Sequence, residues 1–293
     1  MDAYVKAFWL PKDGSSEEEY EDAFFPRHSS SLTGERLRFA VADGATEASF
    51  SRLWARMLVR AFVRRSLDLP LTLEQLAPLR ELWSASIHDK PLPWYAEEKA
   101  ASGAFSSLLG LELAEERPEG NVKRTWRAVA AGDTCLVQVT GDRLVRTFPL
   151  NESAQFNNTP NLLGSLPGGP PLHGGFDDGI QRDKTVGTTE GSEPLEPGGE
   201  SASRGPSDQS GKFDDSSLVL ECTGNWAPED QFLLMTDALA CWFLKEFERG
   251  RKPWSIFKEA EANDEASFRE LIVKLRSEGA IKNDDVTLMK IEL

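Results

Sequence analysis

A short apolar run that ends in a carboxylate constrains this chain more than any other feature. Residues 37–42 (LRFAVA) predict a buried strand, and Asp43 and Gly44 follow it at once, before an amphipathic segment. A carboxylate at the end of a strand lies at the edge of its sheet and faces the crevice beyond. Asp43 is therefore a candidate metal ligand, although Asp-Gly is also ordinary turn chemistry.

Acids stand beside two further apolar runs near the C-terminus. The run 231–236 (QFLLMT) ends at Asp237, and Asp284 precedes the run 286–291 (VTLMKI). Three carboxylates that share two divalent cations can hold a bridging water, lower its pKa and direct it at a phosphorus atom. We predict that Asp43, Asp237 and Asp284 converge in one cation-binding site and carry catalysis there.

Composition limits the partners and the metal. The net charge of -15 argues against nucleic acid and membranes, which both require clustered Lys and Arg. The chain has only three histidines and three widely spaced cysteines without a CxxC pair, so neither zinc nor a disulfide framework is indicated. Oxygen ligands then favour Mg²⁺ or Mn²⁺. We find no signal peptide and no membrane-spanning run, and expect a cytoplasmic protein.

The hydrophobic pattern predicts one domain with many antiparallel strands. The turns at residues 132–133 and 141–142 predict three successive strands in one large antiparallel sheet, and Pro78 predicts a break in the second helix. Residues 163–216 are rich in Gly, Pro, Ser and acids and predict a flexible insertion. The predicted strands cover residues 3–10, 37–42, 100–113, 125–131, 134–140, 143–148, 218–222, 231–236 and 286–291, and the helices cover residues 49–65, 73–87, 239–247 and 265–276.

Six short motifs then occur in a fixed order along almost the whole chain. They are EDA (21–23), FAVADG (39–44), GAFSSLLGLEL (103–113), GDT (132–134), LLMTDAL (233–239) and NDDVTLMKI (283–291). In this order they resemble the PPM or PP2C-type metal-dependent protein serine/threonine phosphatases. The resemblance implies a four-layer αββα sandwich, an α+β fold of two antiparallel sheets flanked by helices. It also implies that residues 1–293 form a single domain with a binuclear manganese or magnesium centre.

The resemblance also assigns roles to individual residues. It makes Asp43 the carboxylate that bridges both ions and the Gly44 carbonyl a ligand of one, while Asp237 and Asp284 bind the other. The implied reaction is attack by a metal-bridging water on phosphoserine or phosphothreonine of a protein or peptide. Asp133 matches the acid of a third, weaker metal site.

Other positions would support these ligands or bind the substrate. Glu21 and Asp22 would act through water or hold the ligands in place. The family's early Arg, which grips the substrate phosphate, is missing from its usual place at residues 17–19. Lys12 or Arg27 would have to substitute for it.

Three further departures leave the function open. Ala45 stands where eukaryotic members carry a presumed general-acid His, Cys241 replaces an Asp of the third metal site, and Asp285 replaces an Asn. The first hypothesis is a metal-dependent phosphomonoesterase, most simply a protein phosphatase. The alternative is a PPM-fold regulatory or binding module with weak or lost activity. An acidic structural protein whose Asp residues only form turns is the third.

Overall fold

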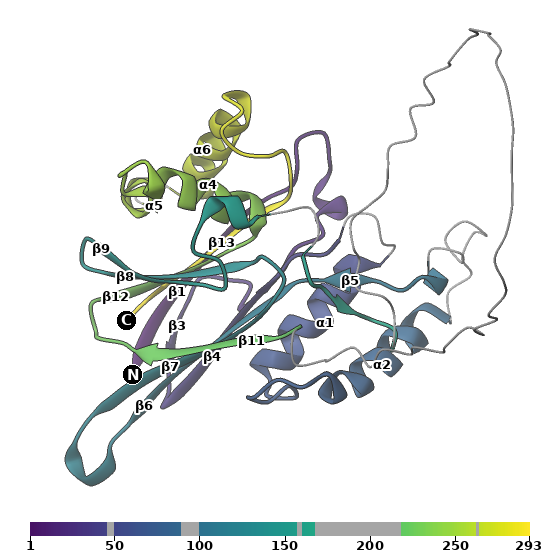
Figure 1. Ribbon diagram of the computed structural model, residues 1–293, viewed down its shortest axis with the longest axis horizontal. Helices are drawn as coiled ribbons and strands as arrows, with labels where there is room; N and C mark the ends of the chain where they lie inside the picture. The colour runs from purple at the N-terminus through teal and green to yellow at the C-terminus, as the bar shows by residue number, and fades with distance from the viewer. Residues whose placement is uncertain (46–49, 89–99, 157–159, 168–217, 262–263) are drawn as a thin grey trace, which may run out of the picture. The chain divides into compact units, whose positions relative to one another are not determined.

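Two antiparallel sheets form the centre of the structure, a computed structural model that describes residues 1–45, 50–88, 100–156, 160–167, 218–261 and 264–293 (Figure 1). The six-stranded sheet has the order β3-β1-β13-β12-β8-β9 and the five-stranded sheet the order β11-β7-β6-β4-β2. A two-stranded sheet joins β10 (Leu163–Gly164) to β5 (Phe105–Ser106). The first sheet comprises β1 (Asp2–Leu10), β3 (Ser30–Thr33), β8 (Cys135–Thr140), β9 (Arg143–Phe148), β12 (Asp230–Met235) and β13 (Val286–Glu292), and the second comprises β2 (Ala23–Phe25), β4 (Arg36–Ala42), β6 (Leu108–Glu116), β7 (Lys123–Ala131) and β11 (Leu220–Asn225).

Alternating side chains divide the apolar residues into three layers. In β4, Phe39 and Val41 pack between the two sheets, whereas Ala40 and Ala42 pack against helices on the other face. β12 does the same from the opposite sheet, with Phe232 and Leu234 facing inward and Leu233 and Met235 facing a second group of helices. A strand buried on both faces has a continuous apolar run, as residues 39–42 do. The predicted αββα sandwich is therefore confirmed.

Helices cover both outer faces (Figure 1). α1 and α2 pack on the five-stranded sheet, and α4, α5 and α6 pack on the six-stranded sheet. No helix in the described part of the chain is long and apolar enough to cross a membrane. The bounds are α1 (Ser51–Val63), α2 (Ala77–His88), α4 (Asp237–Glu248), α5 (Pro253–Glu261) and α6 (Glu265–Ser277), with short 3-10 helices at η1 (Glu17–Glu19), η2 (Leu73–Leu76), η3 (Pro118–Gly120) and η4 (Ser153–Gln155).

The turn at Gly132 and Asp133 corrects one prediction. β7 and β8 belong to different sheets, so the predicted run of three strands in one sheet is wrong, and only β8 and β9 form a hairpin. Gly132 has a φ of +91°, and a Cβ there would lie 2.7 Å from the Cβ of Ser107. The turn therefore carries the chain from one sheet to the other at a tightly packed point.

Three other predicted elements differ from the structure. The helix predicted at 73–87 is split into η2 and α2, and Pro78 is accommodated in the first turn of α2. The strand predicted at 100–113 is interrupted between β5 and β6, while α5 was not predicted. The predicted insertion begins at Leu163, but Leu163 is buried in β10, and residues 168–217 lie outside the described residues.

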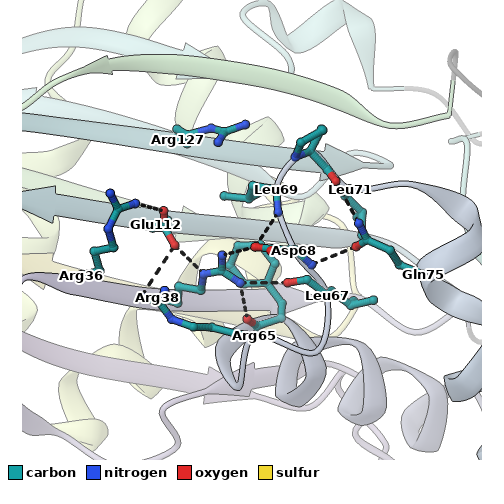
Figure 2. A network of polar contacts seen from close by, with 12 residues as sticks. Arg36, Arg38, Arg65, Leu67, Asp68, Leu69, Leu71, Gln75, Glu112 and Arg127 are labelled. Carbon is teal, nitrogen blue, oxygen red and sulfur yellow. Dashed lines mark hydrogen bonds and ion pairs between the residues drawn. The ribbon is translucent and has the colours of Figure 1, made fainter.

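A buried ion pair fastens the C-terminal end of α1 to the five-stranded sheet (Figure 2). Arg38 of β4 donates to Oε2 of Glu112 in β6 at 2.6 Å. Its guanidinium also donates to the carbonyl oxygens of Phe62 (3.2 Å) and Leu67 (2.8 Å), which end the helix and follow it. Both charged side chains are about 95% buried, with exposed fractions of 4% and 5%.

Gly110 of β6 leaves space for the helix that this ion pair holds. A Cβ at Gly110 would lie 2.5 Å from the ring of Phe62, which is fully buried and has no room to move. We expect Gly110→Ala to lower the free energy of unfolding by about 1–3 kcal/mol through overpacking. Urea unfolding measures this. Gly34→Ala, at a half-exposed site with ordinary φ, is the control and should change stability by less than about 1 kcal/mol; equal losses would contradict the packing argument.

Candidate functional site

Alternating strand directions bring the predicted acids to one edge of the sandwich. Asp43 comes directly after β4, and Asp133 lies two residues after the end of β7. Asp237 is the first residue of α4, which follows β12. β2 and β13 run antiparallel to β4 and β12, and they begin directly after Asp22 and Asp285. In an antiparallel pair the end of one strand lies beside the start of the next, so these acids meet although they are far apart in the chain.

The gathered carboxyl groups raise one another's pKa. Burial raises the pKa of Asp43 well above its ordinary value, and the charges of Asp22 and Asp237 add to this. Burial and the charge of Asp284 raise the pKa of Asp237, while burial and Asp237 raise that of Asp133 to about 7. The Asp43 carboxyl group lies close enough to Asp237 to lower the pKa of Asp237 slightly and so to oppose part of this rise. We call Asp22, Asp43, Asp133, Asp237 and Asp284 the acid cluster.

Two serines fix the backbone of Asp43. The Asp43 N–H donates to Oγ of Ser107 at 2.8 Å, and the Asp43 carbonyl accepts from Oγ of Ser106 and from the Ser107 N–H, each at 2.8 Å. Ser107 Oγ also bonds with Oγ1 of Thr134, next to Asp133, at 2.6 Å. The sequence motif GAFSSL therefore matters for its hydroxyl groups, a role that its apolar pattern did not reveal.

Glycine is required after Asp43 because two backbone segments approach it closely. A Cβ at Gly44 would lie 2.9 Å from the carbonyl oxygen of Glu21 and 3.1 Å from the backbone of Ser51. The side chains of these two residues also meet, since Ser51 Oγ donates to Oε1 of Glu21 at 2.7 Å. The first residue of α1 is thus joined to the acidic motif and to the end of β4.

Asp22 is fixed by hydrogen bonds that involve two residues the sequence did not point to, Thr287 and Tyr20. Asp22 is 2% exposed, and its Oδ2 accepts from Oγ1 of Thr287 at 2.7 Å. The Tyr20 hydroxyl, also buried, makes a short hydrogen bond with the same Thr287 oxygen. The Thr236 hydroxyl lies close enough to Asp22 to lower its pKa, but the buried Oδ1 of Asp22 makes no hydrogen bond of ordinary geometry among the described residues. The only sequence signals for Tyr20 and Thr287 were an aromatic residue in an acidic loop and a polar residue in an apolar strand.

Asp285 organises the loops around the acid cluster. Its two carboxylate oxygens accept from the backbone N–H groups of Lys12 at 2.8 Å and Glu21 at 2.6 Å. Its change from the family's Asn therefore brings a buried carboxylate with two donors rather than an unpaired charge. The Lys12 backbone thus lies beside Asp285. Arg27 is exposed, with its guanidinium 5.8 Å from the centre of the Phe24 ring, and it lines a cleft together with Asp22.

Lys282 supplies a positive charge that sequence reasoning also missed. Its Nζ lies 2.8 Å from Oδ2 of Asp284. Burial lowers the pKa of Lys282, but the hydrogen bond and charge of Asp284 and the charge of Asp237 outweigh burial and raise it. Arg276 donates to the Asp284 carbonyl at 2.6 Å. The only signal in the sequence was the adjacency of a Lys to the acids of the last motif.

The departures from the family pattern are visible in the structure. Ala45 is half-buried and its N–H donates to the Phe105 carbonyl at 3.0 Å, so no titratable side chain stands at that point. Cys241 is half-buried, with its Sγ 3.9 Å from the Ser153 carbonyl. Across the ranges that the structure describes, no group of three or more His, Cys, Asp or Glu side chains is spaced to hold a metal ion. The acids are gathered but are not drawn together into a complete ligand set.

Comparison with known proteins adds the fold family. No protein-family model matches the sequence, and no curated protein is significantly similar to it. Among solved structures, the serine/threonine phosphatase PstP/Ppp of Mycobacterium tuberculosis is 14% identical, with 100% of this chain and 99% of that chain covered and a TM-score of 0.50. The PstP catalytic domain in complex with two manganese ions is 11% identical over 99% and 98% of the two chains, at a TM-score of 0.47. RsbX in complex with magnesium is 14% identical over 100% and 96%, at 0.41. In fold, the chain resembles the PPM or PP2C-type phosphatases.

Proposed function

We propose that this chain is a manganese- or magnesium-dependent phosphomonoesterase that acts on phosphoserine or phosphothreonine in proteins. The acid cluster is the observation that carries the proposal. Five carboxyl groups share one edge of the sandwich, and burial together with the charges of neighbouring acids raises the pKa of four of them, Asp22, Asp43, Asp133 and Asp237. Such a group of ionised carboxylates lowers the stability of the folded protein unless cations offset the negative charge.

The donor set fits hard divalent cations. Carboxylate and carbonyl oxygens are the ligands that Mg²⁺ and Mn²⁺ prefer, and the buried Oδ1 of Asp22 makes no hydrogen bond of ordinary geometry among the described residues. Asp43, the Gly44 carbonyl, Asp237 and Asp284 would hold two ions, and Asp133 a weaker third. When bound, such ions provide a water nucleophile near neutral pH and offset the charge of the phosphoryl group.

The other residues of the site would position the metal ligands, and they limit where the proton for the leaving group can come from. Ser106 and Ser107 fix the Asp43 backbone, so the carboxylate needs little rearrangement to reach its working position. Glu21 and Asp22 would orient the metal-binding side chains through water or hydrogen bonds, without binding the ions directly. Ala45 has no side-chain proton to give, so the proton of the leaving alkoxide must come from water or from another group of the site. Lys12, beside Asp285, is a candidate for contact with the substrate phosphate.

Metal-dependent hydrolysis tests the proposal. We expect the native chain to hydrolyse an aryl phosphate and a phosphothreonine peptide only with Mn²⁺ or Mg²⁺. Asp237→Asn should lower kcat/KM at least about a hundredfold, because one ligand charge is lost at the reacting centre. Glu229→Gln removes a carboxylate on the exposed turn between β11 and β12 and is the matched control. Turnover that persists in a chelator would contradict the metal requirement.

A second candidate is a PPM-fold regulatory or binding module with lost activity. Ala45 and Cys241 favour it, as does the lack of a complete ligand set among the described residues. Isothermal titration with Mn²⁺ separates the two candidates. Metal binding that Asp237→Asn weakens, without any turnover, would identify the module; binding with turnover identifies the enzyme.

A further inference from the structure

Four arginines gather beside the acid cluster on the outer side of β2 and α1. Arg52, Arg56 and Arg60 recur every four residues and so share one side of α1, and Arg27 lies two residues beyond the end of β2. Burial lowers the pKa of Arg56, and the charges of Arg52, Arg27 and Arg60 lower it further, in that order. The other three guanidinium groups are therefore close enough to Arg56 to repel it, and Arg27, Arg56 and Arg60 line one cleft. We call these residues the arginine cluster.

No carboxylate of the described residues forms an ion pair with any member of the arginine cluster. Arg52 donates to the backbone carbonyl of Glu18, and its Nε is buried without a hydrogen bond. Arg36 and Arg38, by contrast, are paired with carboxylates (Figure 2). A freely solvated helix face explains exposed Arg27 and Arg60, but not half-buried Arg56 or the buried Nε of Arg52. An anion would satisfy that donor and offset the crowded charges.

The arginine cluster begins next to the candidate active site. Asp22 of the acid cluster shares a cleft with Arg27, Arg56 and Arg60. The cleft has a volume of about 10 Å³, enough for a single water, so a larger anion would lie across the guanidinium groups rather than inside. A chain segment bound there would run from the arginine cluster along the edge strand β2 towards Asp22.

We propose that the arginine cluster binds acidic groups of the substrate protein, carboxylates or phosphates that flank the phosphorylated residue. This proposal rests on the proposed phosphatase function and names its substrate class as acidic phosphoproteins. Charge complementarity supports this occupant, since a surface with a net charge of -15 repels such a segment elsewhere. Arg27 then contributes to substrate binding at a flanking group, a more limited role than that of the missing early Arg.

Peptide binding tests the proposal without requiring turnover. The probes are three fluorescent peptides that differ only in their flanking residues, which are glutamates, phosphoserines or neutral glutamines. We expect anisotropy titrations with the native chain to give a Kd at least about tenfold lower for both anionic peptides than for the neutral one, with a strong salt dependence. Arg56→Glu/Arg60→Glu should remove this preference. Arg143→Glu/Arg146→Glu makes the same charge change on the exposed strand β9 and should leave it intact.

The outcomes separate this proposal from the proposed function. Equal binding of acidic and neutral peptides, or a preference that survives in the Arg56/Arg60 variant, overturns it. If turnover is absent, but the native chain prefers anionic peptides and the variant does not, the arginine cluster does bind acidic groups and only the phosphatase proposal fails. Sedimentation shows whether the native chain self-associates through this surface; if it does so and the variant does not, a second copy is the occupant and the proposal is wrong. Arg56→Gln/Arg60→Gln, which adds no new charge, should weaken acidic-peptide binding in the same direction.

Discussion

The metal-free chain is expected to lose stability as the pH rises from about 5 to 8, and Mn²⁺ at pH 8 is expected to restore it. Burial and neighbouring acids raise the pKa of Asp22, Asp43, Asp133 and Asp237 in the folded chain. The folded state therefore keeps protons that the unfolded state releases near pH 4. Stability from such groups is complete below the unfolded pKa and is lost as the pH rises through the folded pKa.

Asp133 sets the expected size of this effect. Its pKa moves from an ordinary 3.8 to about 7. One pKa unit corresponds to about 1.4 kcal/mol, so ionisation of Asp133 alone costs roughly 4 kcal/mol of folding free energy from pH 3.8 to pH 8, of which roughly 2–3 kcal/mol is lost between pH 5 and pH 8. A cation that binds only the folded chain opposes this loss, by about 2.7 kcal/mol at a hundred times its Kd. Protons and divalent cations should therefore act as alternative stabilisers of the same cluster.

Thermal unfolding in a chelator at pH 5.5 and pH 8, and in Mn²⁺ at pH 8, measures the effect. Asp133→Asn should flatten the fall in Tm with pH and raise the Tm of the metal-free chain at pH 8, since the amide does not ionise. Glu229→Gln changes a carboxyl group on an exposed turn and should leave the native pH profile in place. A metal-free Tm that stays level or rises between pH 5.5 and 8 would count against a cluster of protonated acids.

The central strands were predictable from the residues because a strand that is buried on both faces has a largely apolar sequence, whereas the layered sandwich was implied only by the resemblance to the phosphatase family. Residues 37–42 and 231–235 show the apolar pattern, and they lie in β4 and β12. Sheet membership was not predictable in the same way. The turn at 132–133 resembles a hairpin locally, and only packing of Gly132 against Ser107 shows that the chain changes sheets there.

The gathering of the acids was predictable from the residues where an acid stands at the end of an apolar run. Asp43 and Asp237 carry that signal, whereas Asp133 was assigned only through the resemblance to the phosphatase family, and the structure brings the three close enough for their charges to interact. Groups that act through the backbone or through hydroxyls carry no such signal. Ser107 hydrogen-bonds to the Asp43 N–H, and Thr287 supports Asp22, but in the sequence each is one polar residue among apolar ones. Their roles depend on contacts between residues 64 and 265 positions apart.

Breaking the Arg38–Glu112 ion pair is expected to cost about 3–5 kcal/mol of folding free energy, because it leaves one charge buried without its partner. Arg38→Met leaves Glu112, whose side chain is 5% exposed, with the more exposed Arg36 and Arg65, whose NH1 and NH2 lie 3.2 Å from Oε1 and 3.9 Å from Oε2. It also removes the donors of the Phe62 and Leu67 carbonyls at the end of α1. Urea unfolding gives the change in stability.

Two further variants identify the cause of the loss. Glu116→Gln breaks the exposed pair between Arg36 and Glu116, whose side chains are 45% and 46% exposed, and should cost less than about 1 kcal/mol. Arg38→Met/Glu112→Leu removes both buried charges and should be more stable than Arg38→Met alone, since no buried carboxylate remains without its buried partner. If Glu112→Leu lowers the stability of Arg38→Met by as much as it lowers the stability of the native chain, the two losses are additive, and the buried carboxylate left by Arg38→Met is not the cause.

Because α1 also contacts Gly44 and Glu21 at its first residue, loosening the other end of α1 should weaken Mn²⁺ binding as well.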